Sequence, residues 1–144
     1  MRYRDLGNSS GGKVFALVFE KGENMVDALL RFAAEQKLSA SSLVGLGAFS
    51  SCLLGFFDRQ EKTYQEIPVD EQVEVLNITG NIALYEGEPR LHAHVTLGRP
   101  DGTAIGGHLL EATVWPTLEI MLTEAEGDIE REYDAETELP LLKP

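Results

Sequence analysis

The sequence predicts an α+β domain in which one long helix covers a mainly antiparallel, curved β-sheet. One segment carries apolar residues at helical spacing, and several others carry apolar runs of strand length between short turns. The chain has 144 residues, of which 43% are hydrophobic, enough to form one core. We therefore expect a single domain over residues 1–144, with its core at about 13–133 and an acidic strand or tail at 124–144.

The first half of the chain predicts a strand, the helix and a long second strand. Residues 13–20 are apolar and are followed by a glycine turn, which favours a buried strand. Asn24 is a good helix N-cap, and Asp27 lies in the first turn, where the helix dipole favours a carboxylate. Residues 41–58 predict a strand whose glycines indicate bulges or close backbone approach. The helix, which should end near residue 37, is expected to face the core with Met25, Val26, Leu29, Leu30, Phe32 and Ala33.

The second half predicts further strands at 62–67, 73–85 and 112–122, with Pro116 confined to an edge or a bulge. From Glu124 to Glu138 every even-numbered residue is acidic, and a period of two is typical of a strand. The favoured role of this pattern is solubility and protection of a sheet edge. Calcium binding and docking of a basic partner are the alternatives. The last residues, 140–144, are expected to be loose unless their leucines dock on a neighbour.

The segment Arg99-Pro100-Asp101-Gly102 has the composition of a tight turn. Pro favours the second position of a type I turn, Asp fits the third, and Gly takes the left-handed conformation that follows. This pattern predicts a hairpin with a one-residue bulge at Gly102. If Arg99 pairs with Thr103, the register places three pairs opposite one another: Leu97 and Ile105, Val95 and Gly107, and His94 and His108.

The three histidines of the chain, His92, His94 and His108, all lie on this hairpin. In the predicted register they share one face of the sheet, because His92 is two residues from His94. Opposed β-carbons lie roughly 5 Å apart and diagonal ones roughly 7–8 Å apart. This spacing suits three imidazole nitrogens at about 2.0–2.1 Å from one divalent metal ion, and zinc is the expected ion. The alternative is three surface or interface histidines without a ligand.

The net charge and the cysteine content indicate which partners and which cellular compartment to expect. The chain has 24 acidic and 12 basic residues, and its net charge of −12 repels nucleic acid phosphates and anionic membranes. No apolar run approaches the roughly 20 residues of a membrane helix. The single cysteine, Cys52, fits a reducing compartment, and its apolar neighbours favour a buried, inert thiol. We expect a soluble, cytoplasmic protein with no membrane partner, and direct nucleic acid binding is disfavoured.

Four motifs, taken together, resemble those of a known family. They are the strand Glu74–Ala83 with its Gly-Asn-Ile sequence, the strand His92-Ala93-His94, the turn Asp101-Gly102 and the return Gly106-Gly107-His108. In this combination and order they resemble the PPC family, the plants and prokaryotes conserved domain. The resemblance covers nearly the whole chain, from about Lys13 to about Tyr133, and is closest to the stand-alone prokaryotic members.

The resemblance implies a compact α+β subunit assembled as a homotrimer. Plant members of the family accompany AT-hook segments in nuclear DNA-binding proteins, where the domain mainly mediates assembly. Prokaryotic members are often named as candidate DNA-binding proteins and have no settled role. Some resemble metal binders through positions that are here His92, His94 and His108. The segment Leu97–Pro100 is similar to an AT-hook core, but it lacks the first arginine and lies in the predicted turn.

Three functions are open on the sequence alone. The first is a homotrimeric module that binds zinc through the three histidines and leaves one coordination position for a small-molecule ligand. The second is a DNA-associated regulatory protein, which rests on the family resemblance only. The third is a zinc-dependent, hydrolase-like enzyme. The nearest acidic residues, Glu88 and Glu111, have no geometric argument as a general base, so no catalytic residue is assigned and an enzyme is the less favoured interpretation.

Overall fold

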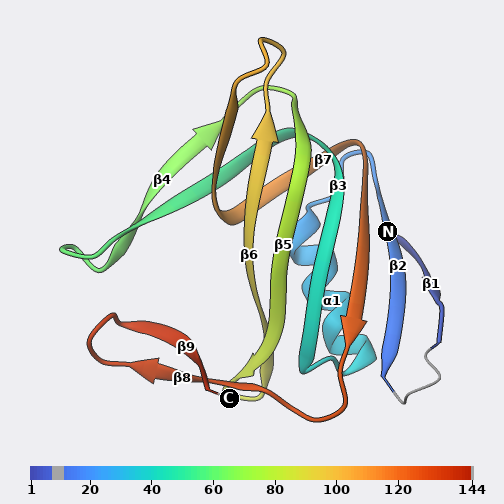
Figure 1. The fold of residues 1–144 in the computed structure, drawn as a ribbon, viewed down its shortest axis with the longest axis vertical. Helices are drawn as coiled ribbons and strands as arrows, with labels where there is room; N and C mark the ends of the chain where they lie inside the picture. The colour runs from blue at the N-terminus through green and yellow to red at the C-terminus, as the bar shows by residue number, and fades with distance from the viewer. Residues whose placement is uncertain (8–11, 144) are drawn as a thin grey trace.

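The computed structural model describes residues 1–7 and 12–143. This part of the chain forms nine strands, which are connected in a single sheet, and one helix (Figure 1). In chain order the elements are β1 (Arg2–Asp5), β2 (Lys13–Glu20), α1 (Met25–Gln36), β3 (Ala40–Asp58), β4 (Thr63–Val69), β5 (Val73–Tyr85), β6 (Glu88–Gly98), β7 (Ala104–Glu124), β8 (Glu130–Asp134) and β9 (Leu139–Lys143). No helix in this part of the chain is long and apolar enough to span a membrane.

The predicted α+β fold, with one long helix covering the sheet, is wrong: the structure is mostly sheet. Helix α1 has 12 residues and is therefore about 18 Å long. The 19 residues of β3 and the 21 residues of β7 would each extend over roughly 60–70 Å if straight. The helix can cover only a short part of such strands. The sheet is also mixed, because Leu84 of β5 pairs in parallel with Glu130 of β8.

The long strands enclose much of the core themselves. Strand β3 pairs with β5 and β7, and β6 pairs with the same two strands, so these four close into a ring. The register shifts along β3 mark irregularities at which strands bend. The largest fully buried side chains come from the strands, from α1 and from the segment between α1 and β3: Phe15, Leu17, Phe19, Met25, Leu29, Phe32, Leu38, Phe49, Leu54, Ile78, Ile82 and Leu97.

Helix α1 begins and ends where the sequence predicts. The side chain of Asn24 accepts a hydrogen bond of 3.2 Å from the backbone N–H of Asp27, and Lys37 forms a left-handed C-cap. The helix lies behind the sheet in Figure 1 and contacts β6 and β7. Its apolar face is rotated slightly from the predicted stripe, with Val26 and Leu30 only partly buried. The buried residues are Met25, Ala28, Leu29, Phe32 and Ala33.

The predicted strands are present, although their ends differ. Strand β5 has the predicted bounds, whereas the strand predicted at 112–122 is the second half of β7. Pro116 lies where the pairing of β7 with β3 is irregular, as predicted for this residue. The expectation of a loose end is wrong for residues 140–143, because β9 pairs with β8, and Pro144 lies outside the described residues.

Two single residues further test the sequence predictions. Cys52 is buried as predicted, and burial raises the pKa of its thiol to about 11. Glu124 departs from the expected acidic outer face: it is buried and accepts hydrogen bonds from the backbone N–H groups of Ser39, at 2.8 Å, and Ala40, at 3.2 Å. The first acidic residue of the alternating run is therefore a structural acceptor that ties the end of β7 to the start of β3.

Candidate metal centre

Strands β6 and β7 form the hairpin that the turn sequence predicts. The backbone N–H of Arg99 donates to the carbonyl of Thr103 at 2.9 Å, and that of Gly102 donates to the carbonyl of Arg99 at 3.0 Å. Gly102 has a φ of 82°, in the left-handed region that favours glycine. The pairs are Leu97 with Ile105, Val95 with Gly107 and His94 with His108, so the predicted register is confirmed.

Two glycines let β7 pack closely between its neighbours just before His108. A β-carbon at Gly106 would lie 2.6 Å from the carbonyl oxygen of Val95 in β6, and one at Gly107 would lie 3.0 Å from that of Gly55 in β3. His108 itself pairs with β6 on one side and with β3 on the other. Close backbone approach on both sides therefore fixes the position from which the His108 side chain projects.

The three histidines lie together, as predicted. One nitrogen from each ring lies within 4.8 Å of a nitrogen from the others, and the Nε2 atoms of His92 and His94 are 3.2 Å apart. The ring centroids are 5.2–5.5 Å apart. Ala93 and Val95, which alternate with the histidines along β6, are buried in the core. Strand alternation thus turns the histidines away from the core and toward one another.

The surroundings favour neutral imidazoles. The pKa of His108 is lowered to about 4, mainly because burial disfavours the charged ring and also because His92, His94 and Arg131 lie near it. Burial likewise lowers the pKa of His92, with smaller contributions from His94 and Arg131. Both rings are therefore neutral at pH 7 and carry the lone pair that a metal ion requires.

The donor set fits a metal ion such as zinc. Nδ1 of His108 is buried and has no hydrogen-bond partner among the described residues. A buried polar atom without a partner is unfavourable, and three imidazoles with converging nitrogens are a ligand set that zinc prefers. Tyr64 of β4 lies against the His108 ring, with centroids 4.6 Å apart and planes inclined by 26°, which limits the orientations of that imidazole.

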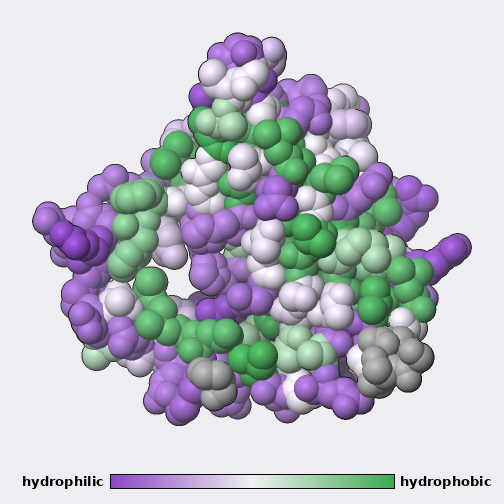
Figure 2. Space-filling view, viewed as in Figure 1, coloured by the Kyte–Doolittle hydropathy of each residue, from purple (hydrophilic) through white to green (hydrophobic). Residues whose placement is uncertain are grey.

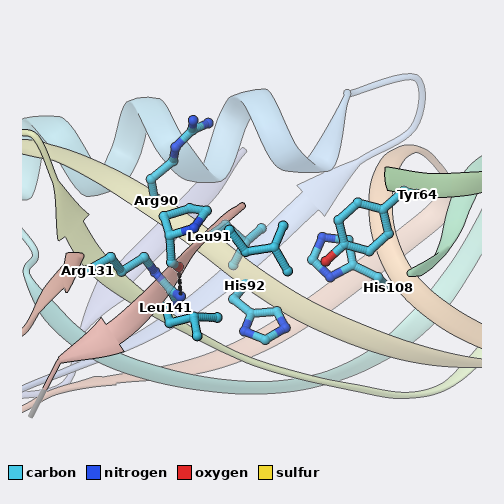
Figure 3. Close-up of a pocket in the computed structure, with 9 residues that line it drawn as sticks. Tyr64, Arg90, Leu91, His92, His108, Arg131 and Leu141 are labelled. Atoms are coloured by element: carbon cyan, nitrogen blue, oxygen red, sulfur yellow. Dashed lines mark hydrogen bonds between the residues drawn. The ribbon is translucent and has the colours of Figure 1, made fainter. Parts of the chain in front are cut away.

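A cavity of about 250 Å³ opens beside His92 and His108 (Figure 3). Figure 2 shows the surface hollowed between the β3–β4 hairpin and the β8–β9 hairpin. The sequence patterns did not indicate the other residues that line this cavity, since most of them lie on β4, β8 and β9, which are distant from the histidines along the chain. One available signal was Arg131, the single basic residue within 124–138. The additional lining residues are Tyr64, Arg90, Leu91, Arg131, Leu139, Pro140 and Leu141.

The two acidic residues considered as general bases do not line this cavity. Glu88 lines a separate cavity with Ser39 and Asp128, and Glu111 lines another with Cys52 and Asp70. Within residues 1–7 and 12–143, no Asp or Glu lines the cavity at the histidines. Neither residue therefore lies at the cavity beside the histidines.

The segment similar to an AT-hook is part of the hairpin. Leu97 and Gly98 end β6, and Arg99 enters the turn. The Arg99 Nε donates to Glu71 at 2.8 Å. An AT-hook must be extended and free to lie along the minor groove, so this segment is not arranged as one.

The family of domains called Plants and Prokaryotes Conserved (PCC) matches residues 6–126. The chain belongs to this family. It is the PPC family that the motifs predicted from the sequence, and the match includes all three histidines. No curated protein matches the chain significantly.

Solved structures of proteins from several organisms resemble this one. A metal-containing protein from Archaeoglobus fulgidus is 32% identical, with a TM-score of 0.85, and the likeness covers 92% of this chain and 94% of that one. A plant- and prokaryote-conserved protein from Pyrococcus horikoshii is 29% identical, with a TM-score of 0.87 and coverage of 99% and 95%. A candidate DNA-binding protein from Ralstonia eutropha is 30% identical, with a TM-score of 0.87 and coverage of 97% and 95%.

The glycines before His108 give a graded prediction. Gly106→Ala places a β-carbon 2.6 Å from a backbone oxygen, whereas Gly107→Ala places one at 3.0 Å, a milder conflict. We expect Gly106→Ala to lower the free energy of unfolding by about 1–3 kcal/mol, and Gly107→Ala by less. Urea unfolding of both variants beside the unchanged protein measures this. Equal stability of the Gly106→Ala variant and the unchanged protein would show that β6 and β7 are not packed this closely.

Proposed function

We propose that this PPC protein is a homotrimeric module that binds a divalent metal ion, zinc, through His92, His94 and His108. The observation that carries the proposal is the convergence of the three imidazoles on one face of the β6–β7 hairpin, with nitrogens within 4.8 Å. Tetrahedral zinc with bonds of about 2.0–2.1 Å needs nitrogens roughly 3.3–3.4 Å apart. The Nε2 atoms of His92 and His94, which are 3.2 Å apart, already lie close to that separation. The metal-containing relative from A. fulgidus adds support.

The arrangement supports binding better than catalysis. A metal ion held by three histidines supplies a Lewis acid that can polarise an oxygen of a bound molecule. The residues of this chain would hold and orient that ion, with Tyr64 packed against His108. The described residues that line the cavity include no carboxylate to take a proton. We therefore favour a binding module over the hydrolase-like enzyme.

An exposed apolar patch supports the homotrimer that the family resemblance implies. We define this patch by Val44, Leu46, Leu76 and Met121, which are 52%, 60%, 57% and 45% exposed. It borders a groove of about 350 Å³ between β2, β3, β5 and β7. Large exposed apolar patches are typical of interaction sites. The occupant that we propose for the patch is a second copy of this chain.

The proposed metal site and the proposed homotrimer together predict the mass of the intact assembly and its zinc content. Native mass spectrometry of untagged protein supplied with zinc should show a trimer with about one zinc per subunit. The variant His92→Ala/His94→Ala/His108→Ala should lose the zinc, because it removes all three ligands. The control Thr96→Ala, also on an exposed position of β6, should keep it. Unchanged zinc content in the histidine variant would refute the site.

The same measurement tests the apolar patch. Leu46→Glu places a charge in the proposed interface and should shift the mass from trimer to monomer. Tyr133→Glu changes a residue that is similarly exposed, at 55%, but lies outside the patch, and it should leave the trimer intact. A trimer that survives Leu46→Glu would place the subunit contact elsewhere.

The second candidate is a DNA-associated role, which the name of the relative from R. eutropha favours. The charges oppose it. The net charge is −12, and several basic side chains already pair with carboxylates. These pairs are Arg2 with Glu20 at 2.7 Å, Lys62 with Glu138 at 3.1 Å and Lys143 with Glu132 at 2.6 Å.

A gel-shift experiment distinguishes the two candidates. We expect no shift of duplex DNA by the zinc-loaded protein at low salt, where electrostatic attraction is least screened. A shift that weakens as salt is added would favour the DNA-associated role instead.

A further inference from the structure

We propose that the cavity beside the histidines binds a small organic anion, whose carboxylate or phosphate group is held by Arg131. The inference deepens the proposed function, since it names the class of ligand for the same site. It takes from the proposed function only the metal ion beside the cavity; the anion site itself is argued from Arg131 and the cavity lining. The PCC match ends at residue 126, before Arg131 and the whole of β9, so the family match does not assign these residues.

Arg131 is a partly buried cation whose hydrogen-bond partners are neutral. Its Nη1 donates to the carbonyl of Pro140 at 3.1 Å, and its Nη2 donates to Oδ1 of Asn81 at 2.5 Å. Its Nε is buried and has no partner among the described residues. None of the ion pairs found in residues 1–7 and 12–143 includes Arg131. A charge removed from water without a counter-ion is unfavourable, and a bound anion would compensate it.

The cavity is a positive site on an acidic protein. The chain has twice as many acidic as basic residues, yet the described residues that line the cavity include Arg90 and Arg131 and no carboxylate. Burial lowers the pKa of Arg131, and the nearby positive charge of Arg90 lowers it further, because the two guanidinium groups repel each other. Planar guanidinium groups recognise carboxylate and phosphate oxygens especially well. An oxyanion is therefore the group that this part of the cavity suits.

The other residues that line the cavity indicate the chemistry of the rest of the ligand. Leu91 of β6 and Leu139 and Leu141 of β9 give the cavity an apolar side. In Figure 3, His92 lies between Arg131 and the pair formed by His108 and Tyr64. The volume of about 250 Å³ is small beside the roughly 300–1,000 Å³ of typical ligand pockets. The ligand is thus a small molecule with an anionic head at Arg131 and a short apolar body that reaches toward the histidines.

Three probes with the same branched body test the head group: isovalerate, isobutyl phosphate and the neutral isovaleramide. Titrations followed by methyl NMR, with and without zinc, report binding at the leucines of the cavity. We expect at least one anion to bind about ten-fold or more tightly than the amide. The tighter of the two anions identifies the head group as carboxylate or phosphate.

Variants of Arg131 separate its charge from the fold. Arg131→Met should abolish the preference for the anion, and Arg131→Lys, which keeps the charge, should retain part of it. The control Arg4→Met changes the net charge equally on β1, outside the cavity, and should leave the affinity within about two-fold. The methyl spectrum of each variant shows whether it is folded. Equal binding of anions and amide, or a preference that survives Arg131→Met, would overturn the inference.

The zinc content of each sample keeps this test independent of the proposed function. Protein that retains zinc but shows no anion preference refutes the anion site and leaves the metal site intact. Protein that binds no zinc but shows an anion preference dependent on Arg131 supports the anion site and refutes the metal site.

Discussion

The register of β6 against β7 is the constraint on which the site depends. Side chains alternate between the faces of a strand, so a slip of one residue would turn His108 toward the opposite face. The left-handed Gly102 sets the register at the turn, and Gly106 and Gly107 let β7 fit closely between β6 and β3. The pairing of the strand backbones therefore determines that the histidines converge. Strands hold side chains in place more precisely than loops do.

The β8–β9 hairpin brings a cationic side chain, Arg131, to the cavity beside the histidines. It joins the large sheet through the parallel pair of Leu84 and Glu130 and the hydrogen bond from Arg131 to Asn81. Asn81 pairs with His92 across β5 and β6, so the bond places the guanidinium beside the candidate metal centre. One cavity thus combines neutral imidazoles, a cation and an apolar wall, a combination suited to a small, partly apolar anion.

The local features were predictable from the sequence, because neighbouring residues determine them. The cap at Asn24, the turn at Arg99–Gly102 and the shared face of the three histidines all follow from spacing and turn chemistry. The helix cover was predicted wrongly, since an apolar pattern shows that a segment is buried but not what buries it. The closing of β3, β5, β6 and β7 into a ring, the buried Glu124 and the arrival of Arg131 at the cavity depend on long-range pairing. The sequence marks Arg131 as the single basic residue within 124–138, but no local pattern shows which distant residues any of these groups contact.

Zinc X-ray absorption spectroscopy of the metal-loaded protein tests the central claim most directly, because it reports the atoms bound to the ion. The account predicts three imidazole nitrogens at about 2.0–2.1 Å, with at most one further light atom. Scattering from sulfur at about 2.3 Å, or a shell of oxygens without imidazole, would contradict it.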